Sequence, residues 1–113
     1  MISLTNVSQE YKQGNSLTKV LNNLEFNIES GEKIGIIGPS GSGKTTILNI
    51  IALLEQPTSG EINIFQQNCK LLDSEEKVIF RRKKIGFVFQ NSQLLEDFTV
   101  EENIALPLIL DGL

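Results

Sequence analysis

Apolar and polar residues alternate in three stretches of the chain, at residues 2–7, 23–28 and 61–65. A period of two predicts half-buried β-strands in these places. Residues 33–37 differ, because Ile34, Ile36 and Ile37 form a nearly continuous apolar run. Such a run is typical of a strand that is buried on both faces.

Helical spacing follows in three other stretches. Residues 44 to about 54 carry apolar side chains on most sides of a helix, so we expect this helix to be well buried. Ser74 is expected to cap a second helix. Thr99 and Glu102 match a capping box for a third helix, which Pro107 should kink or end.

The order of these elements predicts the fold class. Strands and helices alternate only after residue 34, where another strand is expected at residues 85–89, and an antiparallel-looking β region comes first. The mixture predicts an α/β fold with a β subdomain. A length of 113 residues allows one ordinary domain.

Composition excludes several classes of function. The formal charge of −4 argues against a polycation that coats nucleic acid, and we expect no nucleic-acid partner. The chain has no histidine, which excludes a histidine-ligated metal or a histidine base within these residues. Its single cysteine, Cys69, cannot form an internal disulfide. No run approaches the roughly 18 apolar residues of a spanning helix, so we expect membrane association only through a partner.

The strongest chemical signal is Gly-Pro-Ser-Gly-Ser-Gly-Lys-Thr at residues 38–45, which matches the phosphate-binding loop at every fixed position. Glycines let backbone N–H groups approach phosphate oxygens, and the following helix N-terminus favours an anion. Lys44 can reach the β- and γ-phosphates, Thr45 can hold Mg²⁺, and Thr46 can touch the α-phosphate. The predicted nucleotide-binding residues of this segment are Gly38, Pro39, Ser40, Gly41, Ser42, Gly43, Lys44, Thr45 and Thr46.

The residues around this loop resemble those of the ABC transporter ATPases. Residues 38–46 look like their Walker A segment, and residues 56–62 like the Pro-Thr-Ser-Gly turn after their first helix. Residues 85–90 are similar to the strand that ends in their Q-loop glutamine, here Gln90. The resemblance implies a P-loop NTPase fold with ATP and Mg²⁺ as cofactors. It assigns adenine stacking to Tyr11, and contact with Mg²⁺ or water and sensing of the transport partner to Gln90.

Within this family, residues 94–103 and 105–108 look most like the lipoprotein-releasing, Lol-type subunits. The resemblance implies an ATP-binding subunit that couples ATP binding and hydrolysis to lipoprotein release from a bacterial inner membrane. Such subunits pair as homodimers and bind integral permease subunits at the cytoplasmic side of that membrane. Related cell-division and macrolide-export ATPases carry similar segments and remain alternatives.

Other motifs of the resemblance do not occur. There is no Leu-Ser-Gly-Gly-Gln signature loop, no strand ending in Asp-Glu and no switch histidine. Asp111 ends an apolar run, but Gly112 follows it, and we interpret this run as helical. The chain is therefore expected to be the N-terminal half of one nucleotide-binding domain, truncated in its helical subdomain. The expected parts are a β subdomain at about 1–32, a RecA-like P-loop core at about 33–90 and the start of the helical subdomain at about 91–113.

Two rival interpretations belong to other classes. One is a non-catalytic fragment that binds nucleotide weakly or does not fold. The other is a small GTPase or kinase, although no Asn-Lys-x-Asp motif for guanine occurs in the chain.

We expect the 113-residue chain alone not to release phosphate from Mg²⁺-ATP at a useful rate. Its loop supplies phosphate contacts and a hydroxyl for Mg²⁺, but no carboxylate is placed to orient the attacking water. The measurement is phosphate release by the purified chain, with Lys44→Ala as the control for contaminating ATPases. Lys44-dependent turnover would mean that Asp111 or another acid of this chain orients the water.

Overall fold

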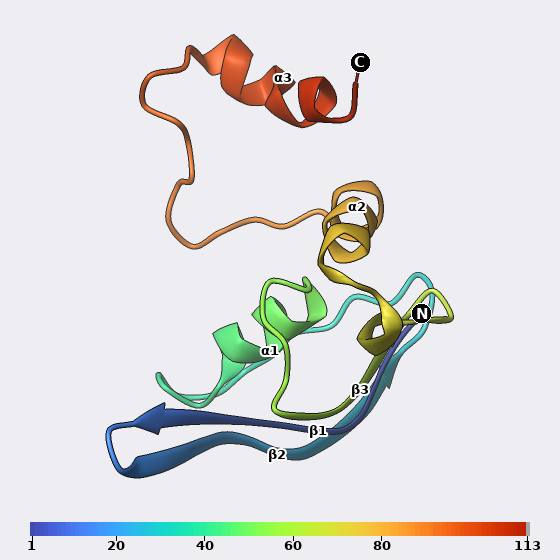
Figure 1. Ribbon diagram of the computed structural model, residues 1–113, viewed down its shortest axis with the longest axis vertical. Helices are drawn as coiled ribbons and strands as arrows, with labels where there is room; N and C mark the ends of the chain where they lie inside the picture. Colours follow the sequence, from blue (N-terminus) through green and yellow to red (C-terminus); the bar gives the residue numbers. More distant parts are fainter. Residues whose placement is uncertain (113) are drawn as a thin grey trace.

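A four-stranded antiparallel sheet with the order β2-β1-β3-β4 forms the base of the structure (Figure 1). The structure is a computed structural model that describes residues 1–112. Strands β1 (Ile2–Gln13) and β2 (Ser16–Ile28) form a long hairpin. Strand β3 (Ser59–Ile64) pairs with the other edge of β1, and the short β4 (Gln67–Asn68) pairs with β3. The antiparallel β region expected before residue 34 is confirmed.

Strands β1 and β2 are longer than their apolar alternation predicts. Three register shifts interrupt the pairing of β1 with β2, between Leu4 and Glu10. These irregularities turn three consecutive residues of β1 inward, so that Val7, Ser8 and Gln9 are all buried. A bulge changes the face to which the following residues point, which is why strict alternation stops at Val7 although the strand continues.

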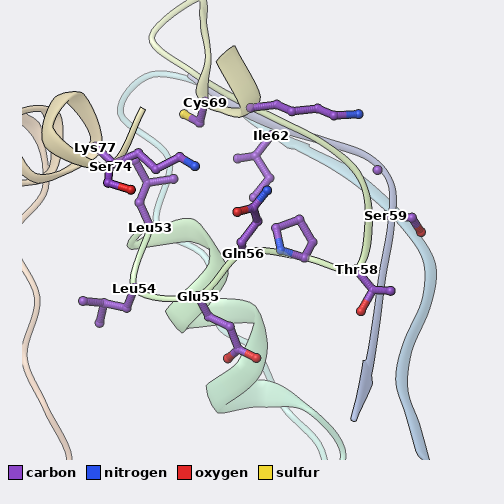
Figure 2. A pocket seen from close by; sticks show the side chains of 13 residues that line it. Leu53, Leu54, Glu55, Gln56, Thr58, Ser59, Ile62, Cys69, Ser74 and Lys77 are labelled. Carbon is purple, nitrogen blue, oxygen red and sulfur yellow. The ribbon is translucent and has the colours of Figure 1, made fainter. Parts of the chain in front are cut away.

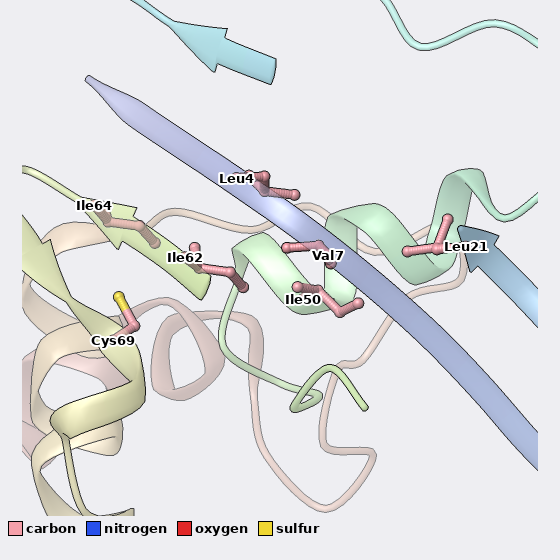
Figure 3. Close-up of a cluster of buried hydrophobic side chains, with 7 residues drawn as sticks. All are labelled: Leu4, Val7, Leu21, Ile50, Ile62, Ile64 and Cys69. Carbon is pink, nitrogen blue, oxygen red and sulfur yellow. The ribbon is translucent and has the colours of Figure 1, made fainter. Parts of the chain in front are cut away.

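Helix α1 (Lys44–Ile51) packs on one face of this sheet, and the core lies between them (Figures 1 and 3). Ile50 is fully buried against side chains of the sheet. The core cluster consists of Leu4, Val7, Leu21, Ile50, Ile62, Ile64 and Cys69.

The prediction of a well-buried helix to about residue 54 is wrong in two respects. Only Ile50 is buried within α1, and Leu48 is largely exposed, because the sheet covers a single face of the helix. The helix also ends at Ile51, since Leu53 adopts a left-handed conformation with φ of 57° just after the C-cap Ala52.

Two predicted strands are absent from the part of the chain that the structure describes. Residues 33–37 and 85–89 form no ladder with each other or with the four-stranded sheet. Ile37 is 94% exposed and Val88 is 96% exposed, so neither segment is buried on both faces. A strand needs a neighbour for its backbone N–H and C=O groups, and among residues 1–112 none is placed beside these segments. The predicted alternation after residue 34 is therefore formed only in part: α1, β3 and a helix at residues 74–84 follow one another, without the strands at 33–37 and 85–89.

Helix α2 (Ser74–Lys84) follows the 3₁₀-helix η1 (Cys69–Leu71). Asp73, and not Ser74 as predicted, is its N-cap: the Asp73 carboxylate accepts a hydrogen bond from the Glu76 N–H at 2.9 Å. The Glu76 carboxylate accepts one from the Asp73 N–H, also at 2.9 Å, which completes a capping box. Ser74 lies one position inside the helix because the aspartate before it satisfies the free N–H group.

Helix α3 (Val100–Leu110) begins with the predicted capping box of Thr99 and Glu102. The expectation that Pro107 ends this helix is wrong, since α3 continues for three residues beyond it. Proline removes only one backbone donor, and Asp111 N–H still donates to the Pro107 carbonyl at 3.2 Å.

A long segment without helix or strand separates α2 from α3 (Figure 1). Arg82 of α2 nevertheless contacts the C-terminal end of α3. Its guanidinium group forms a 3.1 Å ion pair with Asp111 and donates a 2.6 Å hydrogen bond to the Leu110 carbonyl. Asp111 is the C-cap of α3, which confirms the helical interpretation of the run before it. No helix within residues 1–112 is long and apolar enough to cross a bilayer.

We expect Gly60→Ala to destabilise the fold by about 2 kcal/mol or more, because the new Cβ would meet backbone. Gly60 has a φ of 95°, and its Cβ would lie 2.5 Å from the Asn6 carbonyl oxygen and 2.6 Å from Val7 Cα. Gly31→Ala is the matched control, since Gly31 has a φ of 84° and no atom within 4 Å of the added Cβ. Urea unfolding measures both variants, and equal losses would show that the contact with β1 is not the cause.

Candidate functional site

The glycine-rich loop leads directly into the first turn of α1. Its last residue, Gly43, is the N-cap of α1 with a φ of 93°, and Gly41 has a φ of 79°. Glycine adopts these left-handed conformations without the strain that a Cβ brings. A Cβ on Gly43 would also lie 3.0 Å from the side chains of Val20 and Leu21, so this glycine lets the loop lie close to β2.

The Lys44 ammonium group lies over the loop. Its Nζ donates to the carbonyl oxygens of Gly38 at 2.7 Å and Pro39 at 2.6 Å, and lies 3.3 Å from Ser42 Oγ. Ser42 Oγ itself donates to the Pro39 carbonyl at 2.7 Å. A Cβ on Gly38 would lie 2.7 Å from Ser42 Oγ, so a side chain at this position would require the serine hydroxyl to move.

The residues present fit the polyphosphate that the loop motif predicts. The first-turn N–H groups of α1 have no partner within the helix, and the N-cap Gly43 has no side chain to accept from them. These N–H groups and the Lys44 ammonium group provide donors for an anion at the start of α1. Thr45 places a hydroxyl on the same turn. Within residues 1–112 no three carboxylate, cysteine or histidine side chains gather into a metal site. The Thr45 hydroxyl is an oxygen ligand of the kind that Mg²⁺ accepts beside phosphate oxygens.

Tyr11 lies near the end of β1 and close to α1. Its hydroxyl donates to the Glu55 carboxylate and is 3.5 Å from Thr46 Oγ1, so the structure brings Tyr11 and Thr46 of the predicted set together. About one third of its surface is exposed. Stacking of its ring on adenine stays a prediction.

Gln90 is exposed in the segment that follows α2. No hydrogen bond of the described residues joins it to the loop, and the strand that was expected to end at Gln90 is not formed. Its contact with Mg²⁺ or water stays a prediction.

Three polar residues near Tyr11 were missed by the sequence analysis: Gln9, Glu55 and Thr58. The Gln9 amide donates to Glu55 Oε1 at 2.8 Å, and Thr58 N–H donates to Gln9 Oε1 at 2.8 Å. A glutamine two positions after the alternating stretch at residues 2–7, followed by tyrosine at position 11, is the only local signal, and it does not reveal a partner 46 residues away.

A cavity of about 280 Å³ lies outside the loop, between β3, the segment after α1 and the start of α2 (Figure 2). Its lining includes Leu53, Pro57, Cys69 and Lys77 and no residue of the loop. Burial raises the pKa of the Cys69 thiol, which disfavours the nucleophilic thiolate. The cavity therefore does not extend the phosphate site, and Cys69 fits the interpretation of a core residue.

Comparisons with known proteins place this chain in a family. The family model described as "ABC transporter" matches residues 21–111. An uncharacterized ABC transporter ATP-binding protein of Methanocaldococcus jannaschii, MJ0796, is 49% identical over 109 residues, which cover 96% of this chain and 46% of that protein. The lipoprotein-releasing system ATP-binding protein LolD of Rickettsia bellii is 44% identical over 112 residues, covering 99% of this chain and 48% of LolD.

Solved structures show the same similarity. A dimeric structure of a post-hydrolysis state of the MJ0796 cassette, bound to ADP and Pi, superposes with a TM-score of 0.93 at 47% identity. The match covers 97% of this chain and 47% of the cassette. A second dimeric MJ0796 structure gives a TM-score of 0.94 at 48% identity. The chain thus spans about half the length of the curated relatives it matches.

Proposed function

Since this chain belongs to the ABC transporter family and has its P-loop NTPase fold, we propose that it binds ATP with Mg²⁺ as the N-terminal part of a transporter's ATP-binding subunit. The observation that carries the proposal is the position of the Lys44 ammonium group over the loop carbonyls at the N-terminus of α1. A single cation beside free N–H groups suits the β- and γ-phosphates of a nucleotide.

The chain's residues have separate tasks in this proposal. The loop N–H groups and Lys44 bind and orient the phosphates, and Thr46 lies one residue further along α1, where it can reach the α-phosphate. Tyr11 stacks on the adenine, which separates base recognition from phosphate recognition. Thr45 and Gln90 contact Mg²⁺, which when bound neutralises charge on the phosphates during transfer to water. Hydrolysis itself is assigned to the complete subunit.

We propose that the chain has the three parts that its sequence predicts. A β subdomain at about 1–32 would hold the base, a P-loop core at about 33–90 would hold the phosphates, and a helical subdomain would begin at about 91. Residue 113, which the expected helical part includes, lies outside the described residues.

The complete subunit is proposed to work as a homodimer that binds permease subunits at the cytoplasmic side of a bacterial inner membrane. The dimeric MJ0796 cassettes support the pairing of subunits. Release of lipoproteins is the proposed cargo reaction, supported by the similarity to LolD over nearly the whole chain. Cell-division and macrolide-export systems are the alternatives, because their ATPases carry segments similar to residues 94–108.

Depletion of the complete subunit in its own host distinguishes the proposed lipoprotein release from the two alternatives. Lipoproteins that accumulate in the inner membrane would support the proposed cargo. Filamentous growth without this accumulation would support the cell-division alternative, and macrolide sensitivity alone would support the export alternative.

We expect Lys44→Ala to weaken binding of Mg²⁺-ATP to this chain by about tenfold to a hundredfold, because it removes a charge-assisted hydrogen bond to the phosphates. The fold should persist, because the Lys44 side chain lies on the loop and not in the core. Titration with ATP, followed by calorimetry, measures the affinity, and circular dichroism checks the fold.

Lys84→Ala is the control for this test, because Lys84 is an exposed lysine in the last turn of α2. Its ATP affinity should equal that of the unchanged chain. Equal affinities in the Lys44 and Lys84 variants would contradict the assignment of the loop as the phosphate site.

A further inference from the structure

A connected set of hydrogen bonds ties the Tyr11 hydroxyl to the turn after α1. The Glu55 carboxylate is its centre, because one of its oxygens, Oε1, accepts from both the Tyr11 hydroxyl and the Gln9 side-chain amide. Glu55 is half-buried, and in Figure 2 its carboxylate points away from the Cys69 end of the cavity. Glu55 is one of the residues that line the cavity, and its carboxylate bonds to Gln9 and Tyr11.

Gln9 fixes the place of that carboxylate. Only 6% of Gln9 is exposed, and both ends of its amide are used. The NH₂ group donates to Glu55, while the carbonyl oxygen accepts from the Thr58 N–H at 2.8 Å and lies 3.3 Å from Thr58 Oγ1. A flipped amide would place its oxygen against the carboxylate and its NH₂ group against an N–H donor, so a single orientation satisfies every partner.

Thr58 connects this amide to the backbone of β1. Its Oγ1 accepts from the Glu10 N–H at 3.0 Å, one residue before Tyr11. The strand that carries Tyr11 is thus joined to the turn that carries Glu55 through three consecutive residues, Gln9, Glu10 and Tyr11. Gln9 is the buried member of this network, and its amide uses both of its ends, which favours one arrangement of its partners.

The network fixes the direction of the phenol. Tyr11 has one proton, which it donates to Glu55, and its hydroxyl oxygen then lies 3.5 Å from Thr46 Oγ1, two residues along α1 from Lys44. We propose that Glu55 is a positioning residue for nucleotide selectivity: it holds the Tyr11 ring at the base end of the phosphate site, with Gln9 and Thr58 fixing Glu55. This inference rests on the proposed function, because it requires a nucleotide on the loop.

The test compares binding of Mg²⁺-ATP with binding of inorganic triphosphate, which lacks the base and the ribose. We expect Glu55→Ala to weaken ATP binding by about threefold to tenfold, as the loss of one hydrogen bond predicts, and to leave triphosphate binding unchanged. Glu55→Gln keeps an acceptor oxygen and should restore most of the selectivity for ATP.

Tyr11→Phe keeps the ring and removes only the hydroxyl, so it tests the same link without disturbing the turn. It should reduce ATP binding as Glu55→Ala does. The double variant should be no weaker than either single variant, because both changes break one interaction. Additive losses would overturn the inference, since Glu55 would then act by another route.

Tyrosine fluorescence gives a direct readout, because Tyr11 is the only tyrosine of the chain and there is no tryptophan. ATP should change this emission and triphosphate should not, and Glu55→Ala should reduce the change caused by saturating ATP. A merely structural network would leave the change caused by saturating ATP intact.

The outcomes distinguish the two proposals. Absence of Lys44-dependent binding of both ligands would overturn the proposed function and this inference together. Lys44-dependent binding with the same ratio of ATP to triphosphate affinity in Glu55→Ala as in the unchanged chain would overturn the inference alone. Equal weakening of both ligands in Glu55→Ala would also overturn it, because the network would then support the loop and not the base.

Discussion

The pairing of β1 with a strand on each of its edges organises the fold. Strand β1 is the only strand that pairs with two long neighbours in the part of the chain described, β2 along one edge and β3 along the other. Its register shifts near Val7 and Gln9 turn consecutive side chains inward. Val7 therefore packs with Ile50 of α1, while Gln9 reaches Glu55 beyond the end of the same helix. A regular strand would keep Val7 and Gln9 on one face and turn Ser8, which lies between them, to the other, whereas here all three are buried.

The core beneath α1 has a consequence for the phosphate loop. Ile50 anchors the helix on the sheet, and Gly43 permits the close approach of the loop to Val20 and Leu21 of β2. Helix α1 is thus held on the sheet near both of its ends, by Gly43 next to the loop and by Ile50 near its C-terminus. This support does not extend to residues 33–37, where Ile37 is almost fully exposed. Within residues 1–112, the proposed phosphate site therefore rests on the antiparallel hairpin and on α1, and not on a buried strand before the loop.

Local signals predicted those features whose partners are close in the chain. Lys44 contacts Gly38 six residues away, and Thr99 contacts Glu102 three residues away, so the loop and the start of α3 could be inferred from spacing alone. The cap of α2 was misplaced by one position because Asp73 and Ser74 are both good caps and spacing alone does not choose between them. Residues 33–37 have the composition of a buried strand, but burial requires neighbours that a local pattern does not specify.

The two ends of the proposed nucleotide site therefore differ in their physical origin. The phosphate end is formed by a short loop whose glycines and lysine interact within six residues, so its shape is largely a local property. The base end depends on Gln9 and Glu55, which are 46 residues apart and meet only because β1, α1 and β3 have packed together. Contacts of this kind carry a larger cost of chain ordering and exist only in the folded state. Loosening of β1 would therefore separate Tyr11 from Glu55, and in the proposed site selectivity for the base would report on the packing of β1.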